Sequence, residues 1–504
     1  MMDNLSLPNE TMGQPLDLLL VNVGAKKRVY QGLTKDYSAC EPPFWAALTA
    51  GYIRKHDFTV EILDANGLNL DFNETAKIIS GKNPSHTAIV VYGQQANTCT
   101  PIMVAVEQLC RTIKSLEPDR PIILTGWHPS ALPARTIEET NCDLVVQGEG
   151  FSTLLHLLLG NPIDRIPGLW RKEAGRAVAP KARTENVRDL TGELSHIAWD
   201  LIPWTQAQYR AFNWMCLQDL ESRSRYASLF TSLGCPYKCS FCAIHATYGE
   251  RKIRYWSPGW VLEQIDILAR NHGVRNINFI DELFVFNPKH YLPIAKGLLS
   301  REYKVNICAF ARVDAVDRIS PEDLSMLKRA GFNWFKLGIE SCNSASLSAV
   351  HKGRYTKDDI RRVVAKIHRA GIDLCANFMF GLPGEDYNCM QDTLSFAMEL
   401  NCAFPSFFCT MAPPGSDLYA EAVRKGVKLP DSWIGYAQQG YEFLPLPTEH
   451  LTAPQVLEFR DYAFHAYFTN PRYLDSIEKK FGRVAREHVN GMTSIKLRRK
   501  ILGD

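Results

Sequence analysis

The sequence predicts an α/β protein in which a doubly wound parallel sheet is followed by a partial (β/α)6 barrel and then by a helical tail. Three observations support this prediction. In two long stretches, β-rich runs alternate with helical patterns; a stretch punctuated by prolines lies between them; and the final stretch lacks strand patterns. The 504 residues leave room for about three domains. With 46% apolar and 22% charged residues, the chain can bury a sizeable core.

Short β-rich runs alternate with helical patterns throughout residues 1–160. The expected strands are Asp17–Val23, Thr59–Asp64, Ala88–Tyr92, Ile122–Thr125 and Leu144–Val146. Helical patterns such as Ile102–Leu116 lie between them, which indicates βαβ units and a Rossmann-like sheet. Loops at the carboxyl ends of such strands form the usual ligand crevice. This first domain is therefore predicted to bind a large, partly polar ligand.

The alternation pauses and then resumes along the rest of the chain. Residues 161–225 have weaker periodicity and are predicted to form a hairpin and a connecting segment. In residues 226–429 the expected strands are Ser228–Ser232, Ile277–Ile280, Asn306–Ala309, Trp334–Gly338, Leu374–Phe380 and Ser406–Met411. Six β-then-α units favour a barrel with chemistry at the carboxyl ends of its strands. Residues 430–504 are predicted to form a helical C-terminal domain.

Charge and cysteine content exclude several classes of protein. The chain has 57 Lys and Arg against 54 Asp and Glu, for a formal net charge of +3, and this balance without a basic stripe argues against nucleic acid as a partner. No run reaches the roughly 18–20 apolar residues of a membrane span, and Met1–Pro15 lacks the apolar core of a secretory signal. The 14 cysteines indicate reduced thiols or metal ligands, so a cytoplasmic protein is expected.

Cys235, Cys239 and Cys242 follow a predicted strand on one compact loop. Their spacings place three thiolates where they can bind one metal centre, and no obvious fourth ligand accompanies them. This fits an iron–sulfur cubane with one iron left open, because a structural zinc site needs a fourth ligand and only His245 is near. The three cysteines are the predicted metal ligands and catalytic centre.

The CxxxCxxC spacing, with the aromatic residue Phe241 before the third cysteine, resembles the radical S-adenosylmethionine (SAM) superfamily. The resemblance implies a [4Fe–4S] cluster whose open iron binds SAM, and reductive cleavage of SAM to methionine and a 5′-deoxyadenosyl radical. Arg312 is expected to pair with the SAM carboxylate in a charge-assisted fork. The implied SAM contacts are Phe241, Glu282, Arg312, Glu340, Ser341, Gly381 and Pro383.

Residues 125–129 (Thr-Gly-Trp-His-Pro) and 147–150 (Gln-Gly-Glu-Gly) resemble the cobalamin-binding domain fused to one branch of this superfamily. The branch usually has paired glycines where this chain has Thr125-Gly126. The motif Asp-x-His-x-x-Gly, which supplies a cobalt-ligating histidine, does not follow the first strand. Cobalamin is therefore expected to bind without a histidine lower ligand, with His128 near the rim of the crevice. The implied cobalamin contacts are Thr98, Gly126, His128, Gly148, Glu149 and Gly150.

Together the resemblances imply a cobalamin-dependent radical SAM methyltransferase that acts on an unactivated carbon of a small-molecule or natural-product-type substrate. Such an enzyme consumes two SAM molecules per methylation and needs an electron donor such as flavodoxin or ferredoxin. The architecture also resembles cobalamin-dependent radical SAM cyclases and ring-rearranging oxidoreductases, which need not transfer a methyl group.

Three further interpretations stay open. The first is an enzyme of tRNA methylthiolation. Such enzymes bind a second cluster, for which Cys40, Cys99 and Cys142 are the candidate ligands here. They also end in a basic β-barrel, which the helical tail of this chain does not match. A non-enzymatic iron–sulfur or cobalamin carrier or sensor would cleave no SAM. The first domain could also bind no cofactor and only shape the substrate cavity. Tail and linker aromatic residues such as Trp214 and Trp433 are interpreted as core.

Overall fold

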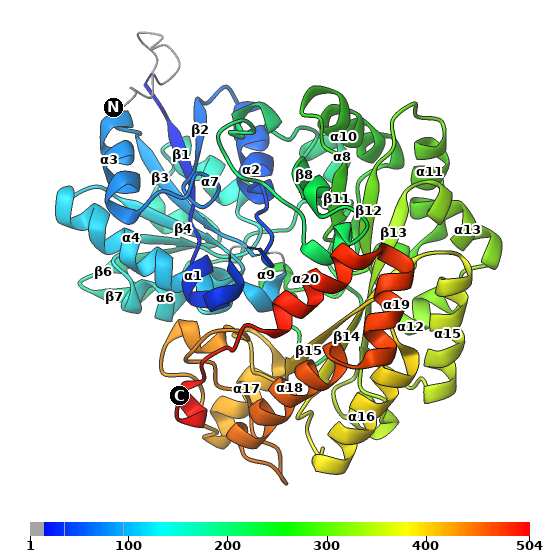
Figure 1. Ribbon diagram of the computed structural model, residues 1–504. Helices are drawn as coiled ribbons and strands as arrows, with labels where there is room; N and C mark the ends of the chain where they lie inside the picture. Colours follow the sequence, from blue (N-terminus) through cyan, green and yellow to red (C-terminus); the bar gives the residue numbers. More distant parts are fainter. Residues whose placement is uncertain (1–14, 35, 94) are drawn as a thin grey trace, which may run out of the picture.

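The computed structural model describes residues 15–34, 36–93 and 95–504. Two sheets, each covered by helices, stand side by side, and the C-terminal helices pack against the second sheet (Figure 1). This confirms the predicted α/β fold with its two sheets and helical tail.

The first sheet has seven strands in the order β2-β1-β3-β4-β5-β6-β7. They are β1 (Leu18–Asn22), β2 (Val60–Asp64), β3 (His86–Val91), β4 (Ile122–Gly126), β5 (Leu144–Val146), β6 (Leu169–Glu173) and β7 (Arg176–Val178). β1 to β5 are parallel, and β1 pairs with both β2 and β3, as at Leu20↔Ile62 and Leu20↔Ala88. The order of strands reverses between β1 and β3, which is where such a sheet opens a ligand crevice.

The hairpin expected within residues 161–225 is β6–β7, and it extends the first sheet. β6 pairs antiparallel with β5, for example at Val145↔Trp170. The hairpin therefore covers backbone groups that β5 would otherwise present at an open edge. The first sheet continues to Val178, beyond the predicted domain limit at residue 160. The domain limits themselves stay predictions.

Helices cover both faces of the first sheet because its strands alternate apolar residues between the two faces. Leu18 and Leu20 belong to one buried cluster, and Leu19 and Val21 belong to the other. The helices are α1 (Lys26–Tyr30), α2 (Phe44–Arg54), α3 (Phe72–Lys82), α4 (Met103–Leu116), α5 (Trp127–Ala131), α6 (Pro133–Glu139), α7 (Phe151–Leu158) and, in the connecting segment, α8 (Leu190–Glu193).

The second sheet is a six-stranded parallel barrel wall in the order β15-β14-β13-β12-β11-β8. Its strands are β8 (Tyr226–Leu229), β11 (Asn276–Phe279), β12 (Asn306–Arg312), β13 (Phe332–Glu340), β14 (Asp373–Phe380) and β15 (Phe404–Cys409). The helices around it are α9 (His245–Tyr248), α10 (Pro258–Asn271), α11 (Pro288–Leu299), α12 (Val313–Val316), α13 (Pro321–Arg329), α14 (Ser344–Ala349), α15 (Lys357–Arg369), α16 (Tyr387–Leu400) and α17 (Asp417–Lys425).

One expected strand is divided in two. Residues 228–232 contain the end of β8 and the start of β9 (Ser232–Leu233), which pairs with β10 (Arg254–Tyr255). A side chain that is distant in sequence causes the break: the Asp281 carboxylate accepts hydrogen bonds from Thr231 N (2.8 Å) and Ser232 Oγ (2.7 Å). The backbone N–H of Thr231 is therefore taken out of the strand ladder.

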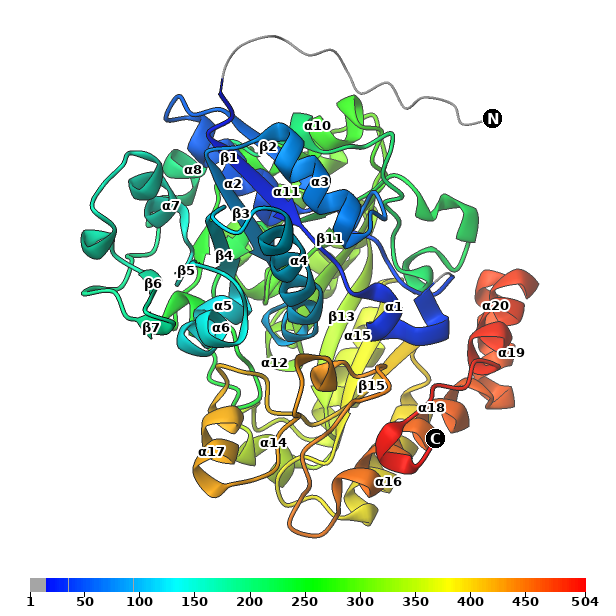
Figure 2. The same ribbon diagram turned by 90° about the vertical axis from the view of Figure 1, so that its left-hand side faces the viewer.

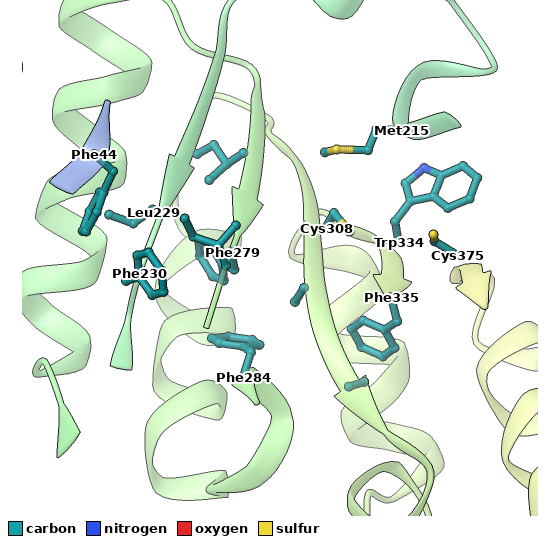
Figure 3. Packing of buried hydrophobic residues seen from close by; sticks show 14 of the residues in the cluster. Phe44, Met215, Leu229, Phe230, Phe279, Phe284, Cys308, Trp334, Phe335 and Cys375 are labelled. Carbon is teal, nitrogen blue, oxygen red and sulfur yellow. The ribbon is translucent and has the colours of Figure 1, made fainter. Parts of the chain in front are cut away.

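The amino end of the barrel is filled by side chains, which leaves the carboxyl end for chemistry. Met215, Cys308, Trp334 and Cys375 lie together there (Figure 3), and all four are buried. Trp334 also stacks on Phe481 of the C-terminal helices, with ring centroids 6.1 Å apart.

The C-terminal region consists of α18 (Ala453–Phe468), α19 (Pro471–Phe481) and α20 (Arg483–Thr493). α20 lies beside α1 and the chain that follows it (Figures 1 and 2), where the rings of Tyr37 and His488 are 4.7 Å apart. The tail thus closes the molecule back onto the first domain. Across the described ranges, no helix has both the length and the apolar character needed to cross a bilayer.

Candidate functional site

A groove of about 1020 Å³, counting the space at its open mouth, lies between the two sheets. One wall contains residues that follow β1 and β3, including Gly24 and Thr98, at the point where strand order reverses. The other wall contains Ser228 of β8 and Ile280, which follows β11. The carboxyl ends of both sheets therefore face one space, at the place where sheets of this kind bind their ligands.

The three motif cysteines are partly exposed on the loop that follows β9. Backbone hydrogen bonds hold this loop: Ser240 N donates to Val350 O at 3.0 Å, and Leu418 N donates to Ser240 O at 2.9 Å. Ten other cysteines, including Cys40, Cys99 and Cys142, are buried, and only Cys389 among the rest is partly exposed. The structure thus separates the triplet from thiols that act as core residues.

The triplet fits a cluster better than a single metal ion. Among the residues that the structure describes, no three Cys, His, Asp or Glu side chains converge closely enough to hold one ion. A cubane places each thiolate on a different iron, so its ligands are spread apart. Burial, reinforced by the nearby Glu282 and Cys239, raises the pKa of Cys235 to about 11. Such thiols ionise when a metal centre supplies positive charge.

His245, the candidate fourth ligand of a zinc site, is turned away from that role. Its Nε2 lies 2.7 Å from Tyr237 O and its Nδ1 lies 3.2 Å from Glu250 O. Both ring nitrogens therefore face backbone carbonyls, and neither is available to a metal held by the three cysteines. This favours the open three-cysteine cluster.

Arg312 ends β12 beside the cysteine loop. Its guanidinium lies over the Tyr237 ring, 3.6 Å from the centroid, and Nη1 donates to Cys239 Sγ at 3.5 Å. Nε and Nη2 fork onto Asp314 at 3.0 and 3.2 Å, and Nη2 also donates to Lys352 O. The fork expected for the SAM carboxylate is therefore occupied by Asp314. A contact between Arg312 and SAM stays a prediction, with Nη1 as the group that faces the cluster loop.

Glu340 closes β13 in an unusual conformation. It has a φ of +65° at an irregular register step, and its carboxylate pairs with Lys352 Nζ at 2.6 Å. Both side chains are 8% exposed. A non-glycine residue in this region is strained, and strain of this kind gathers at functional sites. Lys352, whose Nζ lies 5.9 Å from the Phe241 ring, is a site residue that the sequence analysis missed.

Ser341 and the segment that follows β14 are joined through Glu385. Ser341 Oγ donates to Glu385 Oε1 at 2.9 Å, and Leu382 N donates to Oε2 at 3.1 Å. Gly381 has a φ of +76°, and a Cβ there would lie 2.6 Å from a methyl group of Val456. Ser341 and Gly381 thus fix the ends of two neighbouring strands. Their contacts with SAM, like that of Pro383, stay predictions.

Glu282, which follows β11, is the best-placed of the expected SAM contacts. Both of its carboxylate oxygens are buried without a hydrogen-bond partner among the described residues. Burial raises the pKa of Glu282 to about 8, and the adjacent Asp281 reinforces the shift. Its charge also raises the pKa of Cys235 and Cys242. A buried carboxyl group without a partner, beside the cysteine loop, fits a ligand that brings a hydrogen-bond donor or a cation, such as the SAM amino group.

In the first domain, Thr98 lies at the groove and Gly126 lies between the ends of two strands. Thr98 lines the groove and closes the short turn η2 (Ala96–Thr98), in which its Oγ1 donates to Gln95 O at 2.9 Å. Gly126 has a φ of +130°, and a Cβ would stand 2.1 Å from Val91 O, so only glycine fits between the ends of β3 and β4. Their contacts with cobalamin stay predictions.

His128 and Glu149 are buried, and neither lines the groove, so their contacts with cobalamin stay predictions. His128 Nδ1 lies 3.1 Å from Thr100 Oγ1, and its ring packs 4.6 Å from Trp433. Burial lowers the pKa of His128 to about 3. Glu149 accepts hydrogen bonds from Arg254 of β10 and from Val187 N (2.8 Å), so it ties the first domain to the connecting segment and the barrel. Gly148 and Gly150, on either side of Glu149, have φ of +96° and +85° and so shape the loop that follows β5.

Asn97 links the two cofactor loops and was missed by the sequence analysis. Its Nδ2 donates to Phe241 O at 3.2 Å, and its Oδ1 accepts from Ala243 N at 2.9 Å. Both partners lie in the cysteine loop, on either side of Cys242. The only available signal was its position next to Thr98.

Aromatic side chains at the groove carry unpartnered polar atoms. Trp45 stacks on Tyr92 with centroids 4.3 Å apart, and Trp127 packs edge-on against Tyr92 at 5.1 Å. Trp45 Nε1, Tyr92 OH and Trp127 Nε1 are all buried without a partner among the described residues. Since buried polar groups are nearly always satisfied, these atoms fit a polar ligand in the neighbouring groove.

Comparison with known proteins identifies both halves. The B12 binding domain family matches residues 30–158, and the Radical SAM superfamily matches residues 229–397. An uncharacterised methyltransferase of Pyrococcus horikoshii is 25% identical, over 90% of this chain and 94% of its own length. An anaerobic magnesium-protoporphyrin IX monomethyl ester cyclase of Rubrivivax gelatinosus is also 25% identical, over 75% of this chain and 66% of its own.

Solved structures share the whole architecture. The radical SAM methyltransferase TsrM of Kitasatospora setae, with cobalamin and a [4Fe–4S] cluster bound, has a TM-score of 0.66 at 17% identity, covering 91% of this chain and 90% of that chain. The cobalamin-dependent radical enzyme OxsB, with aqua-cobalamin and SAM bound, has a TM-score of 0.64 at 16% identity and covers 95% and 72%.

The two domain matches fall on the two sheets whose carboxyl ends share the groove. They confirm the expected cofactors. The chain is therefore an enzyme with a B12 binding domain and a radical SAM domain, and these two domains imply a [4Fe–4S] cluster, SAM and cobalamin as its cofactors.

Proposed function

We propose that this enzyme transfers a methyl group from SAM to an unactivated carbon of a small-molecule substrate. The observation that carries the proposal is the hydrogen-bonded link from Asn97 to the backbone of Phe241 and Ala243, which fixes the groove of the first domain against the cysteine loop. When bound, cobalamin supplies a methyl carrier, and the cluster with SAM supplies a radical that removes a hydrogen atom from carbon.

The chain's own residues hold the two centres at one groove. Arg312 fixes Cys239, and the Glu340–Lys352 pair fixes the end of β13 beside the loop. The aromatic wall that includes Trp45 gives the groove apolar lining, which limits the side reactions open to a carbon radical held against it. Flavodoxin or ferredoxin is the proposed source of electrons.

The relatives favour methyl transfer and leave one competing activity. The Pyrococcus and Kitasatospora proteins are named as methyltransferases, whereas the Rubrivivax relative is named as a cyclase. Cyclisation without methyl transfer is therefore the second candidate function. The two activities differ in their SAM products.

The test is anaerobic purification from cells supplied with cobalamin, followed by iron and cobalt analysis. We expect about four irons per chain and an equimolar amount of cobalt. Reduced protein given SAM should then form S-adenosylhomocysteine in proportion to its bound cobalt, whereas protein made without cobalamin should form none. Formation of 5′-deoxyadenosine alone by the cobalt-loaded protein would favour cyclisation. A complete lack of SAM cleavage would favour a carrier or sensor.

A further inference from the structure

A buried ammonium group near the groove is used by none of the cofactor contacts described above. Lys336 lies in the middle of β13 and is 5% exposed. Its Nζ donates to Asn278 Oδ1 at 3.1 Å. Three aromatic rings surround it, with centroids 4.4 Å (Phe310), 5.2 Å (Phe212) and 5.6 Å (Trp214) from Nζ. Phe212 also lines the groove, so the ring of this residue lies between the groove and the ammonium group.

The surroundings of Lys336 contain no directly paired anion. Among the residues that the structure describes, no carboxylate oxygen lies within 4.0 Å of its Nζ. Asn278 Nδ2 donates to Glu41 Oε1 at 3.3 Å, so a neutral amide separates the ammonium from that carboxylate. Buried charges are normally paired directly, and cation–π contacts compensate only a part of the lost hydration. The site is therefore electrostatically suited to an incoming anion.

We propose that Lys336 binds an anionic group of the substrate, a carboxylate or a phosphate, and so sets the substrate class. The inference rests on the proposed function, because it places the substrate in the groove shared by the two domains. Phe212, which lines the groove and stacks on the buried Trp214 with centroids 5.5 Å apart, offers an apolar surface for the carbon skeleton attached to that anion. The anion anchors one end of the substrate, and the carbon to be modified faces the cysteine loop.

The chain offers a matched control and a second variant. Lys328 of α13 is a partly buried lysine whose Nζ also donates to an asparagine, Asn333 Oδ1, at 2.7 Å, but it lies outside the groove. Phe310 is partly exposed and faces Lys336 in the register of β12 and β13. Phe310→Glu therefore places a carboxylate beside Lys336 and should occupy the site internally, whereas Lys336→Met removes the cation.

The experiment measures anion binding by fluorine NMR on the full chain loaded with cluster, cobalamin and SAM, without reductant. The probes are trifluoroacetate for a carboxylate, monofluorophosphate for a phosphate and trifluoroethanol as the neutral analogue. One of the anions should bind saturably to the wild-type protein and to Lys328→Met, and trifluoroethanol should not. Loss of one charge-assisted hydrogen bond should weaken the anion's affinity about tenfold or more in both Lys336→Met and Phe310→Glu.

The anion that binds more tightly identifies the class. Three results would overturn the proposal. The first is equal anion affinity in the wild type and in a Lys336→Met variant with unchanged iron and cobalt. The others are trifluoroethanol binding as tight as that of the anions, and binding of neither anion. If Lys336→Met fails to load its cofactors, Phe310→Glu decides in its place, and unchanged affinity there also overturns it. This binding assay involves no turnover, so it does not depend on methyl transfer. Failure of the proposed function shows in the separate product assay, where S-adenosylhomocysteine is then missing.

Discussion

Replacing Arg254 by methionine is expected to destabilise the protein by about 3–5 kcal/mol, because it leaves the Glu149 carboxylate buried without a counter-charge. The two side chains are 8% and 2% exposed. Arg254 donates to both carboxylate oxygens, with 3.1 Å between Nη1 and Oε2. Each hydrogen bond to a charged group contributes about 1.5–3 kcal/mol, so losing two costs about 3–6 kcal/mol, which overlaps that range. Methionine keeps most of the aliphatic volume, which limits any added cost from a cavity.

Glu149→Gln is expected to cost less. The Arg254 guanidinium keeps Val187 O as an acceptor and lies 5.4 Å from the Tyr248 ring centroid, and a glutamine carbonyl can still accept from Val187 N. The double variant should therefore be more stable than Arg254→Met alone, which a double-mutant cycle of urea unfolding measures. A loss below about 1 kcal/mol in Arg254→Met, the range of an exposed ion pair, would refute the reasoning. Loss of cobalt in Glu149→Gln but not in Arg254→Met would instead make Glu149 a cofactor contact.

Three further perturbations test other parts of the site. Asn97→Ala should leave the iron content unchanged but lower cobalt-dependent S-adenosylhomocysteine formation about tenfold. The reason is that the hydrogen bonds between the Asn97 side chain and Phe241 O and Ala243 N are lost. An unaltered yield of S-adenosylhomocysteine would show that Asn97 has no part in the reaction. Cys239→Ala should abolish 5′-deoxyadenosine formation and the cluster's absorption, whereas the equally partly exposed Cys389→Ala should change neither. Burial lowers the pKa of His128 in the folded protein to about 3, whereas the same side chain in the unfolded chain has the ordinary value of about 6.5. As the pH falls, His128 therefore takes up a proton in the unfolded chain before it does so in the folded protein. Stability should therefore fall by about 1.2 kcal/mol between pH 7 and 5.5 on account of this group; urea titrations that show the same decline in His128→Gln would contradict this.

The fold was largely predictable because its strands are short apolar runs with strong local signals. The expected strand at 144–146 is observed with the same limits. Where the prediction failed, a side chain distant in sequence decided the outcome. Asp281 breaks the strand at Thr231, and the hairpin β6–β7 joins the first sheet because β5 leaves an open edge. Neither effect can be read from local periodicity.

The site was predictable where chemistry demands a fixed spacing and unpredictable where it depends on packing. The cysteine triplet lies on one loop because its ligands must, so its spacing is visible in the sequence. Asn97 and Lys352 act through partners 144 and 12 residues away, at Phe241 and Glu340, and nothing local marks them. His128 sits in a motif that resembles a ligand site, yet tertiary packing against Trp433 buries it.

The distribution of unsatisfied polar atoms shows where this fold depends on its ligands. Glu282 and the aromatic residues Trp45, Tyr92, Trp127 and Tyr248 hold buried polar atoms without partners among the described residues. Burial, reinforced by the nearby carboxylate of Glu282, raises the pKa of Tyr248 well above its ordinary value, so the two residues form one neighbourhood. Each unsatisfied group costs about 1–3 kcal/mol. A ligand that supplies partners at this junction regains part of that cost, and since it binds only the folded chain it must also stabilise the protein. Cofactor loading and stability are therefore coupled at the junction of the two domains, where neither domain alone completes the core.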